Sequence, residues 1–499
     1  MVTFAICVTI LVLGYLFYSK YVDRVFGPDD RKTPAVEIND GTDYVPMKGW
    51  KIFLIQLLNI AGLGPIFGAL NGALFGPVVY LWIVFGTIFA GGVHDYMAGM
   101  MSMRNRGLSV SELTGKYLGP AMLTVMRLFS VVLLVMIGVV FSKGPAGLID
   151  ILTPIEKDET FWLWVIIAYY FVATFLPIDK IIGKAYPVFG IALLVMAFGV
   201  GGVIFFSPKY HMPEFWNGLA NTHPNGIPIL PFLFITVACG AISGFHATQS
   251  PMMARCCTSE RQGRKIFYGA MVAEGIIALV WAAAGMSFYD NAQALLKAGA
   301  GVNAVVYEIC STTLGKVGSI LAILGVIACP ITSGDTAYRS ARLTLADWIR
   351  FDQKSIKNRL ILTIPLLSAG VVISQLDYSV VWRYFSWSNQ TLAMILLWAG
   401  ASYFAREHKQ YYICMIPAVF MSFVTTMYFV LAPECLGILW KAINISSDFQ
   451  YLVALVSGFV FAVACMLLFF RSISRVVGEV IEEPVEEEAI EQDSEKGSK

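Results

Sequence analysis

Long apolar segments separated by short polar connectors run along almost the whole of this 499-residue chain. A segment needs about 20 predominantly apolar residues to cross the roughly 30 Å hydrocarbon core of a bilayer as a helix. The pattern therefore predicts an all-α polytopic membrane protein with about thirteen transmembrane helices. We expect these helices at 2–22, 51–73, 75–103, 120–142, 160–178, 183–206, 228–253, 263–289, 314–345, 357–376, 380–404, 411–431 and 449–471.

Glycine and polar residues interrupt two of these apolar spans. The first interruption is 59–65, Asn-Ile-Ala-Gly-Leu-Gly-Pro, and the second is 240–246, Gly-Ala-Ile-Ser-Gly-Phe-His. An interrupted helix survives in lipid only where protein or a water-filled cavity supplies partners for its backbone. Two such interruptions, one in each half of the chain, indicate the central binding site of a transporter. Close helix packing at small residues is the structural alternative for either segment alone.

Lysine and arginine are concentrated in every second connector, which sets the expected orientation. Basic connectors face the cytoplasm, so the N-terminus is predicted outside and the C-terminus inside. The connector after the first span is basic, with Lys20, Arg24, Arg31, Lys32 and Lys48, whereas Lys209, Lys297 and Lys441 each stand alone in an intervening loop.

This orientation makes the first broken span enter from the cytoplasm and the second, five spans later, enter from outside. Opposite entry at a five-span offset predicts a five-plus-five inverted repeat with two broken helices. A tail rich in glutamate with few apolar residues is expected to be disordered. The expected organisation is an extra N-terminal helix (1–22), a cytoplasmic connector (23–50), the two repeats (51–206 and 228–404), two C-terminal helices (411–471) and a disordered acidic cytoplasmic tail (472–499).

Composition excludes several classes of protein. A hydrophobic fraction of 57% with 14% charged residues is incompatible with a soluble chain of this length. The net charge of +1 gives no signal for a nucleic-acid partner. Nine cysteines are scattered, mostly in apolar runs, and are interpreted as small buried side chains. No phosphate-binding loop, metal-ligand spacing or catalytic set is visible, so neither an enzyme nor a cofactor is expected.

The broken segments contain the candidate substrate-binding residues. Half-helix N-termini favour a carboxylate and half-helix C-termini favour a cation, and glycine lets a ligand approach the backbone. An anionic substrate, such as a small carboxylate or the C-terminus of a peptide, would fit there. The candidates are Asn59, Ala61, Gly62, Gly64, Ser243, Gly244, His246 and Gln249.

Ionisable residues inside the spans are further candidates because they are costly to place in a membrane. His94, Asp95 and Asp335 are expected to form either a proton relay or a structural hydrogen-bond network. Glu274 is another candidate, and His246 suits proton-linked transport because histidine titrates near physiological pH.

A hydroxyl-rich segment occupies 329–336 in the ninth span. Thr332 and Ser333 are adjacent, and two hydroxyls beside an unwound segment can complete an oxygen cage for a small hard cation. The alternative is that both hydroxyls bond back to helix carbonyls. These residues leave the choice between sodium and proton open.

Three segments, 59–66, 90–96 (Ala-Gly-Gly-Val-His-Asp-Tyr) and 243–251 (Ser-Gly-Phe-His-Ala-Thr-Gln-Ser-Pro), resemble the carbon starvation protein A family. Its members are bacterial inner-membrane carriers associated with uptake of peptides and of pyruvate. That family in turn resembles the amino acid–polyamine–organocation superfamily, whose five-helix inverted repeat matches the one expected here. By resemblance to sodium-coupled carriers of this fold, the cage oxygens would be the carbonyls of Leu58, Ala61 and Cys329 with the hydroxyls of Thr332 and Ser333.

The residues and the resemblance together predict a secondary active transporter in the bacterial inner membrane. It would import peptides or small carboxylates such as pyruvate by symport with H⁺ or Na⁺, and the resemblance implies use under carbon starvation. An amino acid or other small-solute symporter of the same fold is the alternative. A channel or a membrane enzyme is less favoured, because neither a polar stripe along several helices nor a catalytic set is evident.

Overall fold

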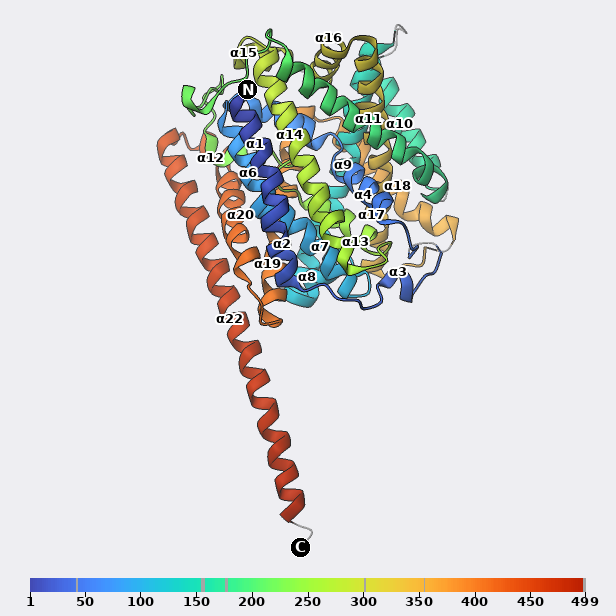
Figure 1. The fold of residues 1–499 in the computed structure, drawn as a ribbon, viewed down its shortest axis with the longest axis vertical. Helices are drawn as coiled ribbons and strands as arrows, with labels where there is room; N and C mark the ends of the chain where they lie inside the picture. Colours follow the sequence, from blue (N-terminus) through green and yellow to red (C-terminus); the bar gives the residue numbers. More distant parts are fainter. Residues whose placement is uncertain (42–43, 154–157, 176–177, 300–301, 354, 497–499) are drawn as a thin grey trace.

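The computed structural model describes residues 1–496 except 42–43, 154–157, 176–177, 300–301 and 354. Within this part of the chain every regular element is a helix, so the predicted all-α class is confirmed (Figure 1). The N-terminus and the C-terminal end of α22 lie at opposite ends of the bundle. A chain that crosses a membrane an odd number of times also has its two ends on opposite sides.

The helices of the first half of the chain follow the predicted apolar segments. Two π-helical turns, η1 (Gly14–Tyr18) and η3 (Thr87–Gly91), join neighbouring helices into continuous spans. The helices are α1 (Val2–Leu13), α2 (Ser19–Phe26), α3 (Pro34–Glu37), α4 (Gly49–Ile60), α5 (Gly64–Gly72), α6 (Val78–Gly86), α7 (Gly92–Arg104), α8 (Val110–Leu118), α9 (Pro120–Leu152), α10 (Glu159–Ala173) and α11 (Ile178–Phe206).

The second half has a matching series of helices. Here η6 (Arg264–Tyr268) leads into α14, and η8 (Ile323–Ala328) joins α16 to α17. The helices are α12 (Ile229–Thr236), α13 (Gly244–Ala254), α14 (Gly269–Phe288), α15 (Ala292–Ala298), α16 (Val302–Ala322), α17 (Cys329–Ile349), α18 (Ile356–Ser374), α19 (Tyr378–Arg406), α20 (Tyr412–Leu431), α21 (Gly437–Ala442) and α22 (Ser447–Lys496).

The number of clear membrane spans is smaller than the predicted thirteen. In the described part of the chain, nine helices are long and apolar enough to cross a membrane, or ten if the bent pair α4–α5 counts as one span. The other three expected spans coincide with helices that miss this standard for physical reasons. α10 has only 15 residues, α12 and α13 are separated by a break, and α19 contains several buried polar residues in its middle.

Both expected breaks are present. Residues 61–63 separate α4 from α5, and the two helices are bent by 48° at this point. Residues 237–243 separate α12 from α13, and Gly240 within them has a φ of +89°, a conformation that favours glycine. We call 61–63 the first break and 237–243 the second break.

Helix contacts match the arrangement that an inverted repeat requires. α4 packs against α13 and α5 against α12, so each half of one broken span meets the opposite half of the other. α9 packs against α18 and α19, and its counterpart α17 packs against α10 and α11. Likewise α5 contacts α14 while α13 contacts α7. Contacts that occur in such pairs are expected of two five-helix units related by a two-fold axis in the membrane plane.

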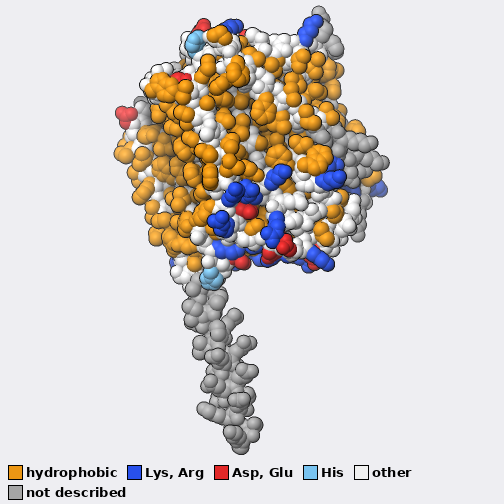
Figure 2. All heavy atoms as spheres, viewed as in Figure 1, with side chains coloured by type: hydrophobic (Ala, Val, Ile, Leu, Met, Phe, Trp, Pro, Cys, Tyr) orange, Lys and Arg blue, Asp and Glu red, His pale blue; other side chains and the backbone are white. Residues whose placement is uncertain are grey.

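The face of the bundle seen in Figure 2 is apolar around its middle. Figure 2 shows hydrophobic side chains over most of the visible face and Lys and Arg gathered towards one end. Large apolar residues such as Phe198, Phe206 and Val372 are exposed, as expected of side chains that face lipid. α22 is helical as far as Lys496, within the segment 472–499 for which the sequence predicts a disordered tail, and 497–499 lie outside the described residues. Glutamate and alanine are good helix formers, which favours this extension.

Candidate substrate and ion site

A buried acid–imidazole cluster connects the second broken span to the neighbouring helix α7. Asp95 lies on α7, and its two carboxylate oxygens contact two histidines. His94 Nδ1 is 2.8 Å from Asp95 Oδ1, and His246 Nδ1, on the first turn of α13, is 2.9 Å from Oδ2. All three side chains are fully buried. Although neighbours on a helix point about 100° apart, His94 and Asp95 are hydrogen-bonded to each other.

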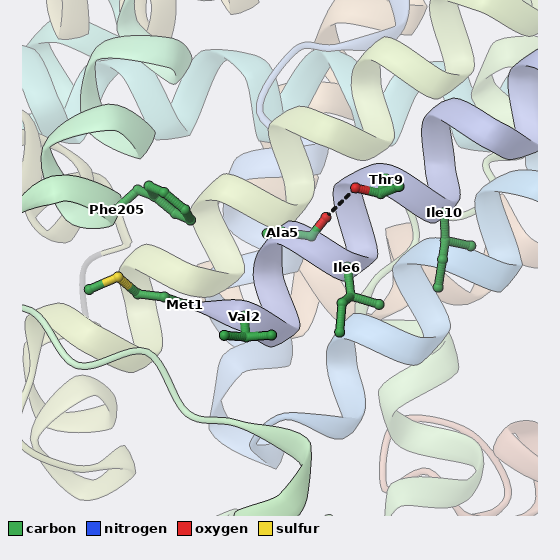
Figure 3. A pocket seen from close by; sticks show the side chains of 7 residues that line it. All are labelled: Met1, Val2, Ala5, Ile6, Thr9, Ile10 and Phe205. Atoms are coloured by element: carbon green, nitrogen blue, oxygen red, sulfur yellow. Dashed lines mark hydrogen bonds between the residues drawn. The ribbon is translucent and has the colours of Figure 1, made fainter.

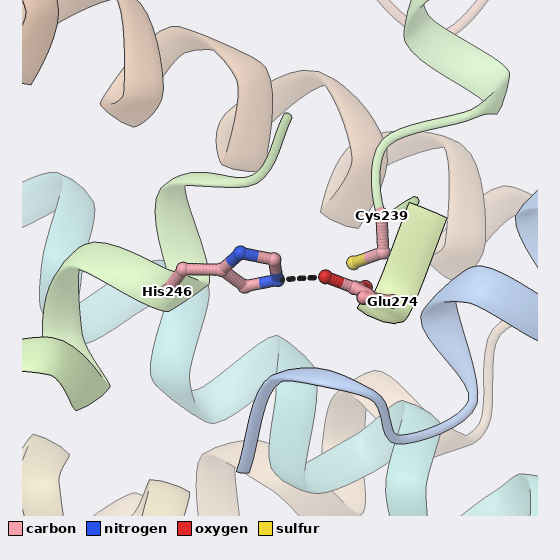
Figure 4. Close-up of side chains that lie close together, drawn as sticks. All are labelled: Cys239, His246 and Glu274. Atoms are coloured by element: carbon pink, nitrogen blue, oxygen red, sulfur yellow. Dashed lines mark ion pairs between the residues drawn. The ribbon is translucent and has the colours of Figure 1, made fainter. Parts of the chain in front are cut away.

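Glu274 extends this cluster to α14. His246 Nε2 lies 3.4 Å from Glu274 Oε2, so the imidazole is held between two carboxylates, one on each side of its ring (Figure 4). Cys239, in the second break, points at the same place, and its Sγ lies within 4.8 Å of the nearest polar atoms of His246 and Glu274. We call His94, Asp95, His246 and Glu274 the central cluster.

Asn389 on α19 holds the second break in place. Its Oδ1 accepts a hydrogen bond of 2.6 Å from the Phe245 backbone N–H, at the N-terminus of α13, and its Nδ2 donates to Ser243 Oγ at 2.9 Å. Thr87 on η3 satisfies another group of the break, because its hydroxyl donates to the Gly240 carbonyl at 2.9 Å. Neighbouring helices thus provide the partners that an unwound segment needs inside a membrane.

Three glycines allow close approach at the breaks, each to a different kind of neighbour. A Cβ on Gly244 would lie 2.3 Å from the Asn389 carbonyl oxygen and 2.7 Å from the Ala393 nitrogen, both backbone atoms. A Cβ on Gly64 would lie 2.3 Å from the side chain of Cys239. At Gly62 the nearest atom is on the side chain of Phe141, whose ring lies 3.0 Å away. Gly64 and Gly244 are therefore positions of tight contact around the second break.

The remaining predicted site residues lie outside the central cluster. Asn59 and Ala61 are buried at the first break. Gln249 is buried on α13, where its Nε2 donates to Thr248 Oγ1 at 2.9 Å and its Oε1 has no hydrogen-bond partner in the described structure. Asp335 is not a member of the central cluster, because it lies on α17 with Arg339 Nη2 3.7 Å from its carboxylate.

Only some of the predicted sodium ligands lie next to one another. Cys329 Sγ lies 4.0 Å from the Leu58 carbonyl oxygen, so the end of α4 and the start of α17 are adjacent. Thr332 Oγ1 donates back to the Cys329 carbonyl at 2.8 Å, the local bond that was the structural alternative. Ser333 Oγ is buried and has no partner among the described residues.

Sequence reasoning missed two residues of this centre. Asn389 is not among the predicted site residues, although the polar Asn389–Gln390 pair inside an apolar span is a signal for it. Cys239 was interpreted as a small buried side chain, and only the fold shows that it lies beside His246 and Glu274.

A surface hollow of about 360 Å³ lies away from this centre, on the outer face of α1. Its lining is almost entirely apolar (Figure 3), as expected of a lipid-facing groove, and it includes Met1, Val2, Ala5, Ile6, Thr9, Ile10 and Phe205.

Similarity to solved structures defines the class of fold. A variant of the manganese transporter of Eremococcus coleocola superposes with a TM-score of 0.56 at 10% identity, over 88% of this chain and 99% of that one. MhsT in complex with L-phenylalanine gives a TM-score of 0.50 at 14% identity, over 86% and 99% of the two chains. The fold is therefore a fold of membrane transporters.

Sequence similarity then gives the family. The chain matches the family described as carbon starvation protein CstA over residues 1–144, 150–302 and 281–428, and it belongs to that family. An uncharacterised membrane protein of Haemophilus influenzae is 44% identical over 345 residues, which are 59% of this chain and 93% of that protein.

Relatives with named activities are more distant. The pyruvate/proton symporter BtsT of Escherichia coli is 27% identical over 55% of this chain and 47% of its own length. The peptide transporter CstA of Campylobacter jejuni is 28% identical over 56% of this chain and 49% of its own length. The chain thus spans about half the length of these two transporters. These relatives are transporters and not enzymes, in agreement with the prediction.

Proposed function

We propose that this chain is a secondary active symporter that couples uptake of a small organic solute to protons through the central cluster. The observation that supports this most directly is the continuous set of contacts from His94 through Asp95 and His246 to Glu274. These fully buried groups come from α7, α13 and α14 and contact one another. Buried acids and imidazoles without a fixed cation are the groups expected of a proton pathway in a membrane protein.

The location of the cluster explains how a proton would be linked to transport. His246 belongs to the helix half that follows the second break, and transporters of this architecture alternate access by moving such segments around a central site. A change in protonation alters the charge between α7, α13 and α14, and therefore alters how favourably these helices pack. Because a buried unpaired charge is costly, proton uptake and helix movement would be coupled.

The substrate that best fits the breaks carries a carboxylate. α5 and α13 both begin at a break, and helix N-termini attract anions. We therefore favour a small carboxylate such as pyruvate, with a short peptide bound through its C-terminal carboxylate as the second candidate. The named relatives support both classes. We further infer that the basic end of the bundle faces the cytoplasm of a bacterial cell, with the N-terminus outside.

Sodium is a second candidate for the coupling ion. The unpartnered Ser333 hydroxyl and the adjacency of Cys329 to the Leu58 carbonyl support it. A sodium site at this position would still need the hydroxyl of Thr332 and the carbonyls of Ala61 and Cys329 to turn towards one ion, because hard cations need about six oxygen ligands.

Transport in liposomes tests this proposal. Purified protein would be reconstituted, and uptake of radiolabelled pyruvate and of labelled di- and tripeptides measured under an imposed pH gradient in sodium-free buffer. A sodium gradient at constant pH forms the second arm. We expect accumulation with the pH gradient alone. Accumulation that requires sodium would overturn the choice of proton, and absence of uptake under both gradients would contradict the substrate classes.

Variants assign the coupling to residues. Asp95→Asn keeps the shape of the side chain but removes its charge, so gradient-driven uptake should fall at least about tenfold, as for removal of a positioned proton-transfer group. Exchange of labelled for unlabelled solute at equal pH should be affected less. The double variant Thr332→Ala with Ser333→Ala should retain proton-driven uptake. His211→Ala, an exposed histidine outside the cluster, is the matched control.

A further inference from the structure

Three potential metal ligands converge beside the second break. Cys239 comes from the break itself, His246 from α13 and Glu274 from α14, and all three are buried. Their Sγ, ring nitrogen and carboxylate oxygen lie within 4.8 Å of one another (Figure 4). We propose that these three side chains form a binding site for a divalent transition-metal ion of the zinc class. His246 and Glu274 also belong to the central cluster, so a bound ion would occupy that part of the proposed proton path.

The distances are close to those of a coordinated metal. Ligand bonds of about 2.0–2.3 Å in tetrahedral geometry separate a nitrogen and an oxygen ligand by roughly 3.3 Å. His246 Nε2 and Glu274 Oε2 are 3.4 Å apart. Cys239 Sγ needs to approach by at most about 1.3 Å, because it lies within 4.8 Å of the other ligand atoms and a sulfur and a nitrogen ligand of one tetrahedral ion are roughly 3.5 Å apart.

The ligand atoms are buried and incompletely hydrogen-bonded. His246 Nε2 and both carboxylate oxygens of Glu274 make no hydrogen bond of normal geometry among the described residues, and Nε2 faces Oε2 at 3.4 Å. A buried polar atom that lacks a hydrogen bond destabilises the folded protein. A metal ion between the imidazole and the carboxylate would give these atoms a shared partner.

Neighbouring residues orient the ligands as they do in metal sites. A metal-binding histidine usually bonds through its other ring nitrogen to a carboxylate, which fixes the tautomer and the ring. His246 makes this contact, because its Nδ1 is 2.9 Å from Asp95 Oδ2 while Nε2 faces the site. Asn389 Nδ2 donates to Cys239 Sγ at 3.8 Å, and a donor of this kind stabilises a thiolate.

The ligand chemistry selects the metal. One sulfur, one imidazole nitrogen and one carboxylate oxygen suit zinc and other borderline-soft ions, whereas magnesium and calcium prefer oxygen ligands only. Three protein ligands leave a fourth tetrahedral position free. A water molecule or the carboxylate of a bound solute would occupy it.

Direct binding measurements test the site. The full chain would be placed in nanodiscs and loaded with cobalt(II), which reports its ligands by absorption, and with radioactive zinc. We expect one bound ion per chain, a thiolate-to-cobalt charge-transfer band, and tetrahedral ligand-field bands in the visible range. Excess zinc should displace cobalt, and millimolar magnesium should not.

Variants separate this site from incidental binding by cysteine. Cys239→Ser is nearly isosteric and should abolish the charge-transfer band, and Glu274→Gln should weaken zinc binding more than about 100-fold, beyond the 10–100-fold expected for the orienting Asp95→Asn. Cys414→Ala removes another buried cysteine, on α20, and should leave binding unchanged. Absence of saturable binding in the wild type, or a band that persists in Cys239→Ser, would overturn the proposal. Because no transport is measured, these results do not depend on the proposed proton coupling.

Discussion

The two breaks occupy equivalent positions in the two halves of the molecule, yet their surroundings differ. The first break, 61–63, consists of Ala, Gly and Leu, and the aromatic ring of Phe141 lies against Gly62. The second break, 237–243, contains Cys239 and Ser243 and is followed directly by His246. Two acids, on α7 and α14, and an amide on α19 contact the second break or the start of α13. The three residues of the first break have no polar side chain.

This difference separates two roles that a broken helix can have. An interrupted helix can leave space for a ligand and expose peptide N–H and C=O groups without any ionisable side chain. Proton or metal chemistry needs titratable groups, and among the described residues the contacts between buried carboxylates and imidazoles involve the start of α13, directly after the second break. The first break is therefore expected to shape the substrate space, and the second to respond to ions.

The largest expected difference between the breaks is steric. Gly244→Ala places a methyl group against the Asn389 carbonyl and the Ala393 nitrogen, and two backbone atoms cannot move aside. We expect a loss of about 3 kcal/mol in stability, at the upper end for overpacking, and loss of uptake. Gly62→Ala meets only the Phe141 ring and should change stability by less than about 1 kcal/mol. Thermal unfolding and uptake by the purified variants check this pair, and equal effects at both glycines would contradict the comparison.

A second test measures the contact between the two broken spans. Gly64→Ala would bring its Cβ within 2.3 Å of both the Cβ and the Sγ of Cys239, so we expect a destabilisation of about 1–3 kcal/mol. Cys239→Gly removes both clashing atoms. The double variant should therefore recover part of the loss, with a coupling energy of about 1–2 kcal/mol from the thermodynamic cycle. Strictly additive effects would show that the two residues do not touch in the folded protein.

The sequence predicts much of this arrangement because breaks and spans are local properties. Glycine and proline at 62–65, and glycine at 240 and 244, are visible without any tertiary information, and the structure breaks both helices within or beside those segments. His246 and Asp95 were candidates because ionisable groups are rare in membrane spans.

Contacts between residues that are far apart in the sequence could not be predicted in this way. The grouping of Asp95 with His246, which are 151 positions apart in the chain, results from how α7 packs on α13. Asp335 belonged to the same list of candidates, but its helix places it beside Arg339 instead. Polarity thus identified the buried ionisable residues, whereas only packing decides which of them act together.

The smallest expected effect concerns the N-terminus of α19, the helix that presents Asn389 to the second break. Asp377 caps this helix, and hydrogen bonds from the Ser379 hydroxyl and backbone N–H lower the pKa of its carboxyl below the usual 3.8. A lowered folded-state pKa means that the cap contributes stability above about pH 4 and loses it as the pH falls further. Asp377→Ala should lower the free energy of unfolding by about 1 kcal/mol at pH 7 and by less below pH 4.

The control is Ser355→Ala, which removes the uncharged cap of α18. Ser355 Oγ accepts from the Asn358 N–H at 3.2 Å, and the loss of stability in this variant should not change with pH. Thermal unfolding of both variants from pH 3 to pH 7 makes this comparison, and a pH-independent effect of Asp377→Ala would contradict the predicted role of its charge.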